Sequence, residues 1–214
     1  AQQVDAAAPF QLENPYMLEV NLNGRVWTKT GAMIAYLGDV TFTREGLLEQ
    51  GMGRMLKRAV SGEVAAMMKV DGRGRVYLAD RGKKVRILEL AKETVFVNGN
   101  DLLALQDGID WDVTMMRRAA GMLAGGLFNI RLTGSGLIAI TTHYEPMTMR
   151  VTTGQALFTD PNATVAWSGS LTPEVVTNID MRTLIGRGSG EAIRLKFAGD
   201  GWVVLQPYEE VYLQ

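Results

Sequence analysis

The segment KVDGRGRVYL at residues 69–78 occurs twice more in related form, as RLTGSGLIAI at residues 131–140 and KFAGDGWVVL at residues 196–205. Each copy has a cationic residue, an apolar residue, one spacer, Gly-x-Gly, one further residue and an apolar run. The first glycines of consecutive copies lie 62 and 65 residues apart. A sequence that resembles itself at a nearly constant interval is typical of an architecture built from repeated units. We therefore predict three such units.

The Gly-x-Gly pairs are predicted to form equivalent turns. Glycine accepts positive φ values and lets a second backbone come close, and tight turns need both properties. The six glycines are Gly72, Gly74, Gly134, Gly136, Gly199 and Gly201. A phosphate-binding loop is the alternative for the glycine-rich stretch 186–191, but this stretch lacks the GxxxxGK[ST] pattern and a strand-then-helix context.

Alternation of apolar and polar residues dominates the chain from residue 16 onward. In the stretch 75–79, for example, Val76 and Leu78 would face one side of a strand, and Arg75 and Tyr77 the other. Such stretches are short and end at glycine, asparagine or aspartate, which is typical of strands joined by tight turns. We predict an all-β fold, with residues 1–14 as an N-terminal lead-in and residues 15–214 as a single domain of three β-rich repeats.

Similar segments also recur outside the Gly-x-Gly copies. MIAY at residues 33–36, LLAL at 102–105 and TVAW at 164–167 resemble one another, and residues 23–27 parallel residues 153–157. From this order we predict that the N-terminal region supplies the second half of one unit, whose first half is the C-terminal Gly-x-Gly segment. The domain would then close with its two termini near one another.

Composition excludes several classes of protein. The chain of 214 residues is 47% apolar and 21% charged, with a net charge of −1, as in an ordinary globular protein. Such a charge produces no strong attraction to nucleic acid, so we do not expect nucleic-acid binding. The absence of cysteine removes disulfides, thiolate nucleophiles and thiolate metal ligands. No stretch reaches the ~18 apolar residues of a membrane span.

Residues that could carry chemistry are few and scattered. The single histidine, His143, lies in THYEP at residues 142–146, which is more typical of an exposed turn than of a catalytic or metal site. Asp107, Asp110 and Asp112 lack the spacing of a calcium loop and are interpreted as solvated carboxylates around the turn at Asp107. We therefore predict no catalytic residue, no metal and no cofactor, and a protein that is not an enzyme.

Three segments between the units mix glycine, methionine or leucine, and basic residues. The basic residues form the candidate interaction surface: Arg54, Lys57, Arg58, Arg117, Arg118, Arg182 and Arg187. One interpretation is that the apolar residues pack on the protein or a second subunit and leave the charges in water. The other is a surface with basic and apolar character, suited to an anionic membrane or an acidic partner. We expect the three segments to lie on one side of the molecule.

An ordered set of short motifs resembles the family named for altered inheritance of mitochondria protein 24. These motifs are GAMI at residues 31–34, LKR at 56–58 with SGE at 61–63, GGLF at 125–128 before Gly134, and GSGE at 188–191 before Gly199. The resemblance covers residues 16–206 and implies three β-sandwich units like that of the tryptophan RNA-binding attenuation protein, arranged about a pseudo-threefold axis. The family has no accepted catalytic residues.

The resemblance also bears on function and location. Fungal members of the family are associated with the mitochondrial inner membrane and its shape. No mitochondrial presequence is visible here, so we expect a bacterial cytoplasmic protein. We predict a structural or interaction protein that acts through its surface, forms a homo-oligomer and binds a protein partner of unknown identity. A small-ligand or RNA-binding ring and a peripheral scaffold on an anionic membrane are the alternatives.

Overall fold

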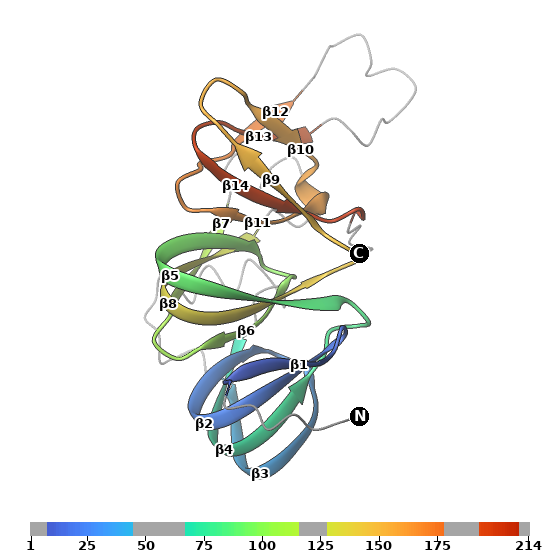
Figure 1. Ribbon diagram of the computed structural model, residues 1–214, viewed down its shortest axis with the longest axis vertical. Coiled ribbons are helices and arrows are strands. Elements are labelled where there is room, and N and C mark those ends of the chain that lie inside the picture. The colour runs from blue at the N-terminus through green and yellow to red at the C-terminus, as the bar shows by residue number, and fades with distance from the viewer. Residues whose placement is uncertain (1–7, 45–66, 116–127, 178–192, 210–214) are drawn as a thin grey trace.

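The computed structural model describes residues 8–44, 67–115, 128–177 and 193–209. In these residues the chain consists of strands and one short 3-10 turn, η2 (Pro161–Ala163), so the prediction of an all-β fold is confirmed. The strands form three groups that follow one another along the chain. Figure 1 shows the three groups arranged along the long axis of the molecule, from blue at one end to orange and red at the other.

Group 1 contains three long strands, β2 (Met17–Lys29), β3 (Met33–Arg44) and β4 (Met67–Leu78). The last of these, β4, lies between the other two and is antiparallel to both. A further strand, β1 (Phe10–Asn14), pairs with the start of β2, and the Phe10 side chain is buried. The prediction of a loose lead-in over residues 1–14 was therefore wrong for residues 10–14, because an apolar side chain fixes this segment to the core.

Group 2 repeats the same arrangement. It contains β5 (Lys84–Asn98), β6 (Leu102–Gln106), β7 (Asp110–Met115) and β8 (Phe128–Thr142). Here β8 lies between β5 on one side and β6 with β7 on the other. The turn between β6 and β7 contains Asp107 and Gly108, as predicted, so β6 and β7 together correspond to the single strand β3.

In group 3 each long strand is divided into two. The strands are β9 (Met147–Val151), β10 (Leu157–Thr159), β11 (Thr164–Ser168), β12 (Glu174–Thr177), β13 (Ile193–Phe197) and β14 (Gly201–Leu205). The last pair again lies in the middle, since β14 pairs with β9 and β11, and β13 pairs with β10 and β12. Each group thus has a first strand (β2, β5, β9–β10), a second strand (β3, β6–β7, β11–β12) and a third strand (β4, β8, β13–β14).

Pairing between the second and third strands follows the same register in all three groups. The pairs are Met33 with Leu78 and Ala35 with Tyr77, Leu102 with Ile140 and Ala104 with Ala139, and Thr164 with Leu205 and Ala166 with Val204. In each group the register shifts between these two pairs, at Ile34, Leu103 and Val165. In each group, the carbonyl oxygen of the residue before the second strand accepts a hydrogen bond from a backbone N–H at the end of the third strand. The bonds are Ala79 N to Ala32 O (2.9 Å), Thr141 N to Asp101 O (2.7 Å) and Gln206 N to Ala163 O (2.9 Å).

The Gly-x-Gly pairs lie in the third strands and mostly not in turns. Gly72 and Gly74 stand in the middle of β4, and Gly134 and Gly136 in the middle of β8. Only the third pair flanks a turn, since Gly199 lies between β13 and β14 and Gly201 begins β14. The prediction of turns was therefore wrong for the first two pairs.

Close approach of two backbones explains these glycines. A Cβ atom on Gly74 would lie 1.9 Å from the carbonyl oxygen of Leu37, and one on Gly72 would lie 2.0 Å from that of Asp39. Both glycines also have positive φ values, 131° at Gly72 and 155° at Gly74. Only glycine fits where the paired backbones of β3 and β4 lie so close together.

The boundaries of the groups differ from those predicted. We expected the N-terminal region to pair with the C-terminal Gly-x-Gly segment, but β2 and β3 pair with β4, which follows them directly in the chain. Each strand that contains a Gly-x-Gly pair is the last strand of its group, because it pairs with the two strands that precede it in the chain. The three groups are therefore continuous in sequence.

Neighbouring groups join through their strands. The first strand of group 1 pairs with the second strand of group 2 (β2 with β6), and the first strand of group 2 pairs with the second strand of group 3 (β5 with β11). Among the described residues the resulting sheet is open and runs from β3 at one end to β9 at the other. Three apolar cores are centred on the groups, around Leu18 and Val76 in group 1, Leu105 and Ile138 in group 2, and Trp167 and Phe197 in group 3. The first two extend across the joints, since Leu103 of group 2 belongs to the first core and Val165 of group 3 to the second.

Candidate functional site

The seven basic residues predicted to form an interaction surface all lie outside the described residues. The ends of the three segments that carry them are nevertheless defined. The segments connect the paired strand ends Arg44 and Met68, Met115 and Phe128, and Thr177 and Ile193. Each segment therefore joins the second strand of a group to its third strand, at the same end of the group.

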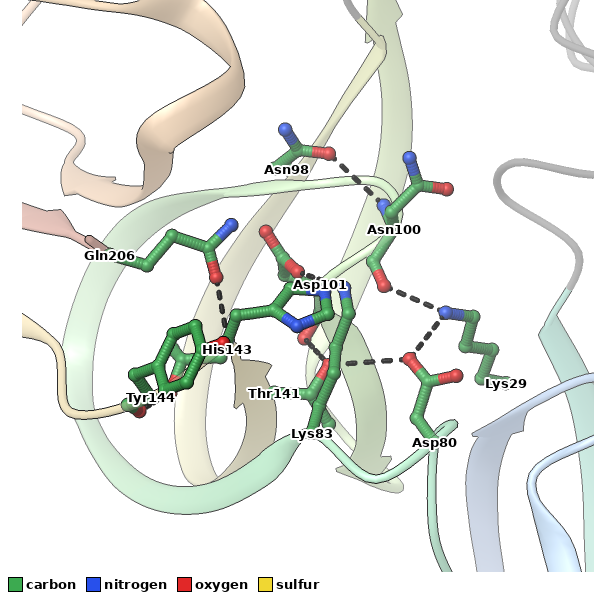
Figure 2. A network of polar contacts seen from close by, with 11 residues as sticks. Lys29, Asp80, Lys83, Asn98, Asn100, Asp101, Thr141, His143, Tyr144 and Gln206 are labelled. Atoms are coloured by element: carbon green, nitrogen blue, oxygen red, sulfur yellow. Dashed lines mark hydrogen bonds and ion pairs between the residues drawn. The ribbon is translucent and has the colours of Figure 1, made fainter. Parts of the chain in front are cut away.

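A buried polar cluster occupies the joint between groups 1 and 2 (Figure 2). The ammonium group of Lys29, at the end of β2, lies 2.7 Å from a carboxylate oxygen of Asp80 and donates a 2.7 Å hydrogen bond to the carbonyl oxygen of Asn100. Asp80 belongs to the β4–β5 connection and Asn100 to the β5–β6 turn. The Lys29 side chain thus connects the two groups.

The same cluster contains a nearly inaccessible ion pair. The ammonium group of Lys83 lies 2.8 Å from Asp101, and their side chains are only 6% and 1% exposed. The Thr141 hydroxyl lies within 3.4 Å of both the Asp80 carboxylate and the Asp101 carbonyl oxygen. A buried charge pair of this kind is stable only when both members are held by further polar contacts. These side chains stabilise the joint, since each already makes a polar contact within the cluster.

His143 lies in the connection between β8 and β9, where a turn was predicted, but it is half-buried. Its backbone N–H donates a 2.8 Å hydrogen bond to the side-chain oxygen of Gln206 (Figure 2). Its ring lies against Tyr208, with 4.1 Å between ring centroids. This arrangement attaches the end of group 3 to the end of group 2.

The aspartates considered in the sequence separate into different settings. Asp107 is exposed in the β6–β7 turn, and Asp110 lies on β7, 3.9 Å from Arg131. Within residues 8–44, 67–115, 128–177 and 193–209 no three histidine or acidic side chains gather as metal ligands would. In the same part of the chain, no helix has the length and apolar character needed to cross a membrane.

Two exposed carboxylates have lowered pKa values. Lys84 donates a 3.0 Å hydrogen bond to Glu145, and this contact, with the nearby Arg86, lowers the pKa of the Glu145 carboxyl. The hydroxyl and backbone N–H of Thr153 donate to Asp200, and these bonds lower the pKa of Asp200. Both contacts favour the charged carboxylate.

An exposed apolar edge on β3 is the feature that the sequence did not reveal. The side chains of Met33, Ile34, Tyr36 and Leu37 are 41%, 57%, 47% and 56% exposed. The matching side chains of β6, Leu102, Leu103 and Leu105, are 0% exposed, and those of β11, Thr164, Val165 and Trp167, are at most 3% exposed. Similar segments are thus covered in groups 2 and 3 and uncovered in group 1.

A second exposed edge lies on β10 in group 3. Phe158 is 49% exposed and stands opposite Lys196 in the pairing with β13. The first strands of the other groups have Trp27 opposite Lys69 and Phe96 opposite Arg131 at the same position. Those two aromatic rings contact a neighbour in the next group: Trp27 meets Trp111 edge-on, and Phe96 stacks on Trp167, each with 5.5 Å between ring centroids.

These features define a class: an all-β protein built from three similarly paired strand groups, with a buried polar cluster at the joint between groups 1 and 2 and apolar strand edges at the two ends. The chain belongs to the family described as mitochondrial biogenesis AIM24, whose model matches residues 10–208. Its fold is similar to that of protein SPYM3_0169 from Streptococcus pyogenes, with a TM-score of 0.73 and 22% identity over 94% of this chain and 92% of that one. No curated protein matches the chain.

Proposed function

We propose that the chain is a triplicated β unit of the kind seen in the tryptophan RNA-binding attenuation protein. Three observations support this: the third strand lies between the other two in every group, the register shifts at Ile34, Leu103 and Val165, and the same backbone hydrogen bond precedes each second strand. The step from group 1 to group 2 uses the same strands as the step from group 2 to group 3. The pseudo-threefold axis stays a prediction, since the described sheet is open.

On this framework, we propose a non-enzymatic scaffold that acts through its surface and associates with itself. The observation that carries the proposal is the exposed edge of β3, where four large apolar side chains between residues 33 and 37 are uncovered. Natural proteins protect such edges with charge, proline or a bulge, or they cover them. The segment 33–37 contains no charge and no proline, and its register shift at Ile34 also occurs in the covered segments of β6 and β11, so a partner strand is the expected cover.

Light scattering after size-exclusion chromatography tests self-association directly. The native chain, with a mass of 23.4 kDa per copy, should elute as a species of at least twice that mass at micromolar concentration. RNase treatment should leave the mass unchanged, which separates this function from an RNA-binding ring. A monomer at every concentration would contradict the proposal.

A peripheral membrane contact is a second candidate function, and one observation favours it. The three basic segments join corresponding strand ends, at Arg44 and Met68, Met115 and Phe128, and Thr177 and Ile193, so their seven basic residues belong to corresponding connections. Each basic residue near an anionic membrane contributes ~1 kcal/mol to binding. The triple variant Arg58→Glu/Arg118→Glu/Arg187→Glu should bind anionic vesicles less strongly and keep its melting temperature. Equal binding by both proteins, or by neither, would refute this contact.

A further inference from the structure

We propose that the exposed β3 edge of one copy pairs with the exposed β10 edge of a second copy, head to tail, with Tyr36 opposite Phe158. This inference rests on the proposed self-association and specifies its geometry. Strands equivalent to these two edge strands pair with each other at both joints inside the chain. A joint always brings a first strand to the second strand of the following group. Among the described residues, the first strand of group 3 (β9–β10) lacks a second-strand partner, and the second strand of group 1 (β3) lacks a first-strand partner.

The two joints inside the chain have one register. In the first joint, Val26, Trp27 and Thr28 of β2 stand opposite Gln106, Leu105 and Ala104 of β6. In the second joint, Val95, Phe96 and Val97 of β5 stand opposite Ser168, Trp167 and Ala166 of β11. Both are antiparallel, and both place the aromatic residue of the first strand opposite a large apolar residue of the second.

The equivalent residues of the open edges follow from pairings inside the groups. Phe158 corresponds to Trp27 and Phe96, because all three stand opposite the cationic residue that precedes the Gly-x-Gly pair by three positions. Tyr36 corresponds to Leu105 and Trp167, because these stand opposite Val76, Ile138 and Val203, two positions after the second glycine. A third joint therefore pairs Leu157 with Leu37, Phe158 with Tyr36, and Thr159 with Ala35.

The chemistry of the two edges suits this pairing. Tyr36 is 47% exposed, whereas its counterparts Leu105 and Trp167 are at most 3% exposed, and Phe158 is 49% exposed, whereas its counterparts Trp27 and Phe96 are partly buried. Neither edge contributes a charged residue to the three pairs. Aromatic cross-strand pairs stabilise antiparallel sheets, and the joint between groups 2 and 3 already contains one in Phe96 and Trp167.

A head-to-tail contact joins two different surfaces, so it continues from copy to copy until a ring closes or a filament forms. This geometry gives a specific experiment with Tyr36→Lys and Phe158→Lys. Each variant loses one edge and retains the other, so each alone should have the mass of one chain, 23.4 kDa, by light scattering. An equimolar mixture should form a dimer and nothing larger, because one intact β3 edge meets one intact β10 edge.

The dimer in the mixture also proves that both variants are folded, so misfolding cannot imitate the result. Tyr16→Lys is the matched control, since Tyr16 is 49% exposed in the β1–β2 connection and takes no part in either edge. This control should assemble like the native chain.

The possible outcomes separate this inference from the proposed function. A native chain that is monomeric overturns both. A native oligomer that persists in both lysine variants overturns the edge pairing alone. A monomeric Tyr36→Lys variant beside an oligomeric Phe158→Lys variant would mean that two β3 edges pair with each other, which also overturns the head-to-tail joint.

Discussion

Residues 33–37 at the start of β3 and residues 102–106 in β6 occupy the same place in their groups, but their surroundings differ. Both segments pair with a third strand in the same register and contain the same shift. Ile34 is nevertheless 57% exposed, whereas Leu103, at the same position, is 0% exposed. The difference comes from the neighbouring group, because β2 covers β6 and nothing in the described residues covers β3. A segment's burial here depends on its partner and not on its own sequence.

The largest difference between the two groups should come from Gly74→Ala and Gly136→Ala. Both positions have positive φ values, which cost a non-glycine residue about 1–3 kcal/mol. At Gly74 the new Cβ would also meet the Leu37 carbonyl oxygen at 1.9 Å, whereas at Gly136 it would meet the flexible Gln106 side chain at 3.1 Å. In urea unfolding, we expect the unfolding free energy to fall by more than ~4 kcal/mol in Gly74→Ala and by about 1–3 kcal/mol in Gly136→Ala. Equal losses would contradict the close approach of the β3 and β4 backbones at Gly74.

The residue before each segment gives the next comparison. Asp101 precedes β6 and pairs with the buried Lys83, whereas the corresponding Ala32 precedes β3. Lys83→Met leaves Asp101 as a buried charge without this ion pair, and the loss of such a partner typically costs ~3–5 kcal/mol. The double variant Lys83→Met/Asp101→Leu should recover most of that loss. No recovery in chemical denaturation would indicate that the pair serves the joint through other contacts.

Truncation of the matched side chains Leu103 and Ile34 tests their burial directly. Leu103→Ala should cost about 2–5 kcal/mol, as expected for a fully buried leucine. Ile34→Ala should change the unfolding free energy by less than ~0.5 kcal/mol, as expected for an exposed site. Both should be measured in the Phe158→Lys background, where no assembly obscures the comparison. A large loss at Ile34 would mean that part of the chain itself covers β3.

The smallest effect concerns the exposed connection after group 2. Lys84 donates to Glu145, and this contact lowers the pKa of Glu145 in the folded protein. The contact between Lys84 and Glu145 therefore stabilises the folded protein at pH values above the ordinary pKa of a glutamate. This stabilisation is lost as the pH falls through the lowered pKa of Glu145. Glu145→Gln should remove that part of the acid dependence and change the stability at pH 7 only slightly. Identical acid denaturation curves for both proteins would contradict the contact.

The sequence predicted the β class and the equivalence of MIAY, LLAL and TVAW, because alternation and local similarity are properties of neighbouring residues. It misplaced the group boundaries and assigned Gly72 and Gly74 to a turn, since a glycine required for the close approach of two paired strands resembles a glycine required for chain reversal. It also did not distinguish Ile34 from Leu103. Their difference depends on a strand from another group, and local pattern contains no information about that strand.

Disulfide trapping tests the proposed joint most directly, because the chain has no cysteine of its own. Directly opposite residues in antiparallel strands have Cα atoms ~4.5–5.5 Å apart, within the range that a disulfide spans. A mixture of Tyr36→Cys and Phe158→Cys should form a covalent dimer under mild oxidation, and a mixture of Asp39→Cys and Phe158→Cys should not. Rapid crosslinking of Tyr36→Cys with itself, or equal crosslinking in both mixtures, would contradict head-to-tail pairing of β3 with β10.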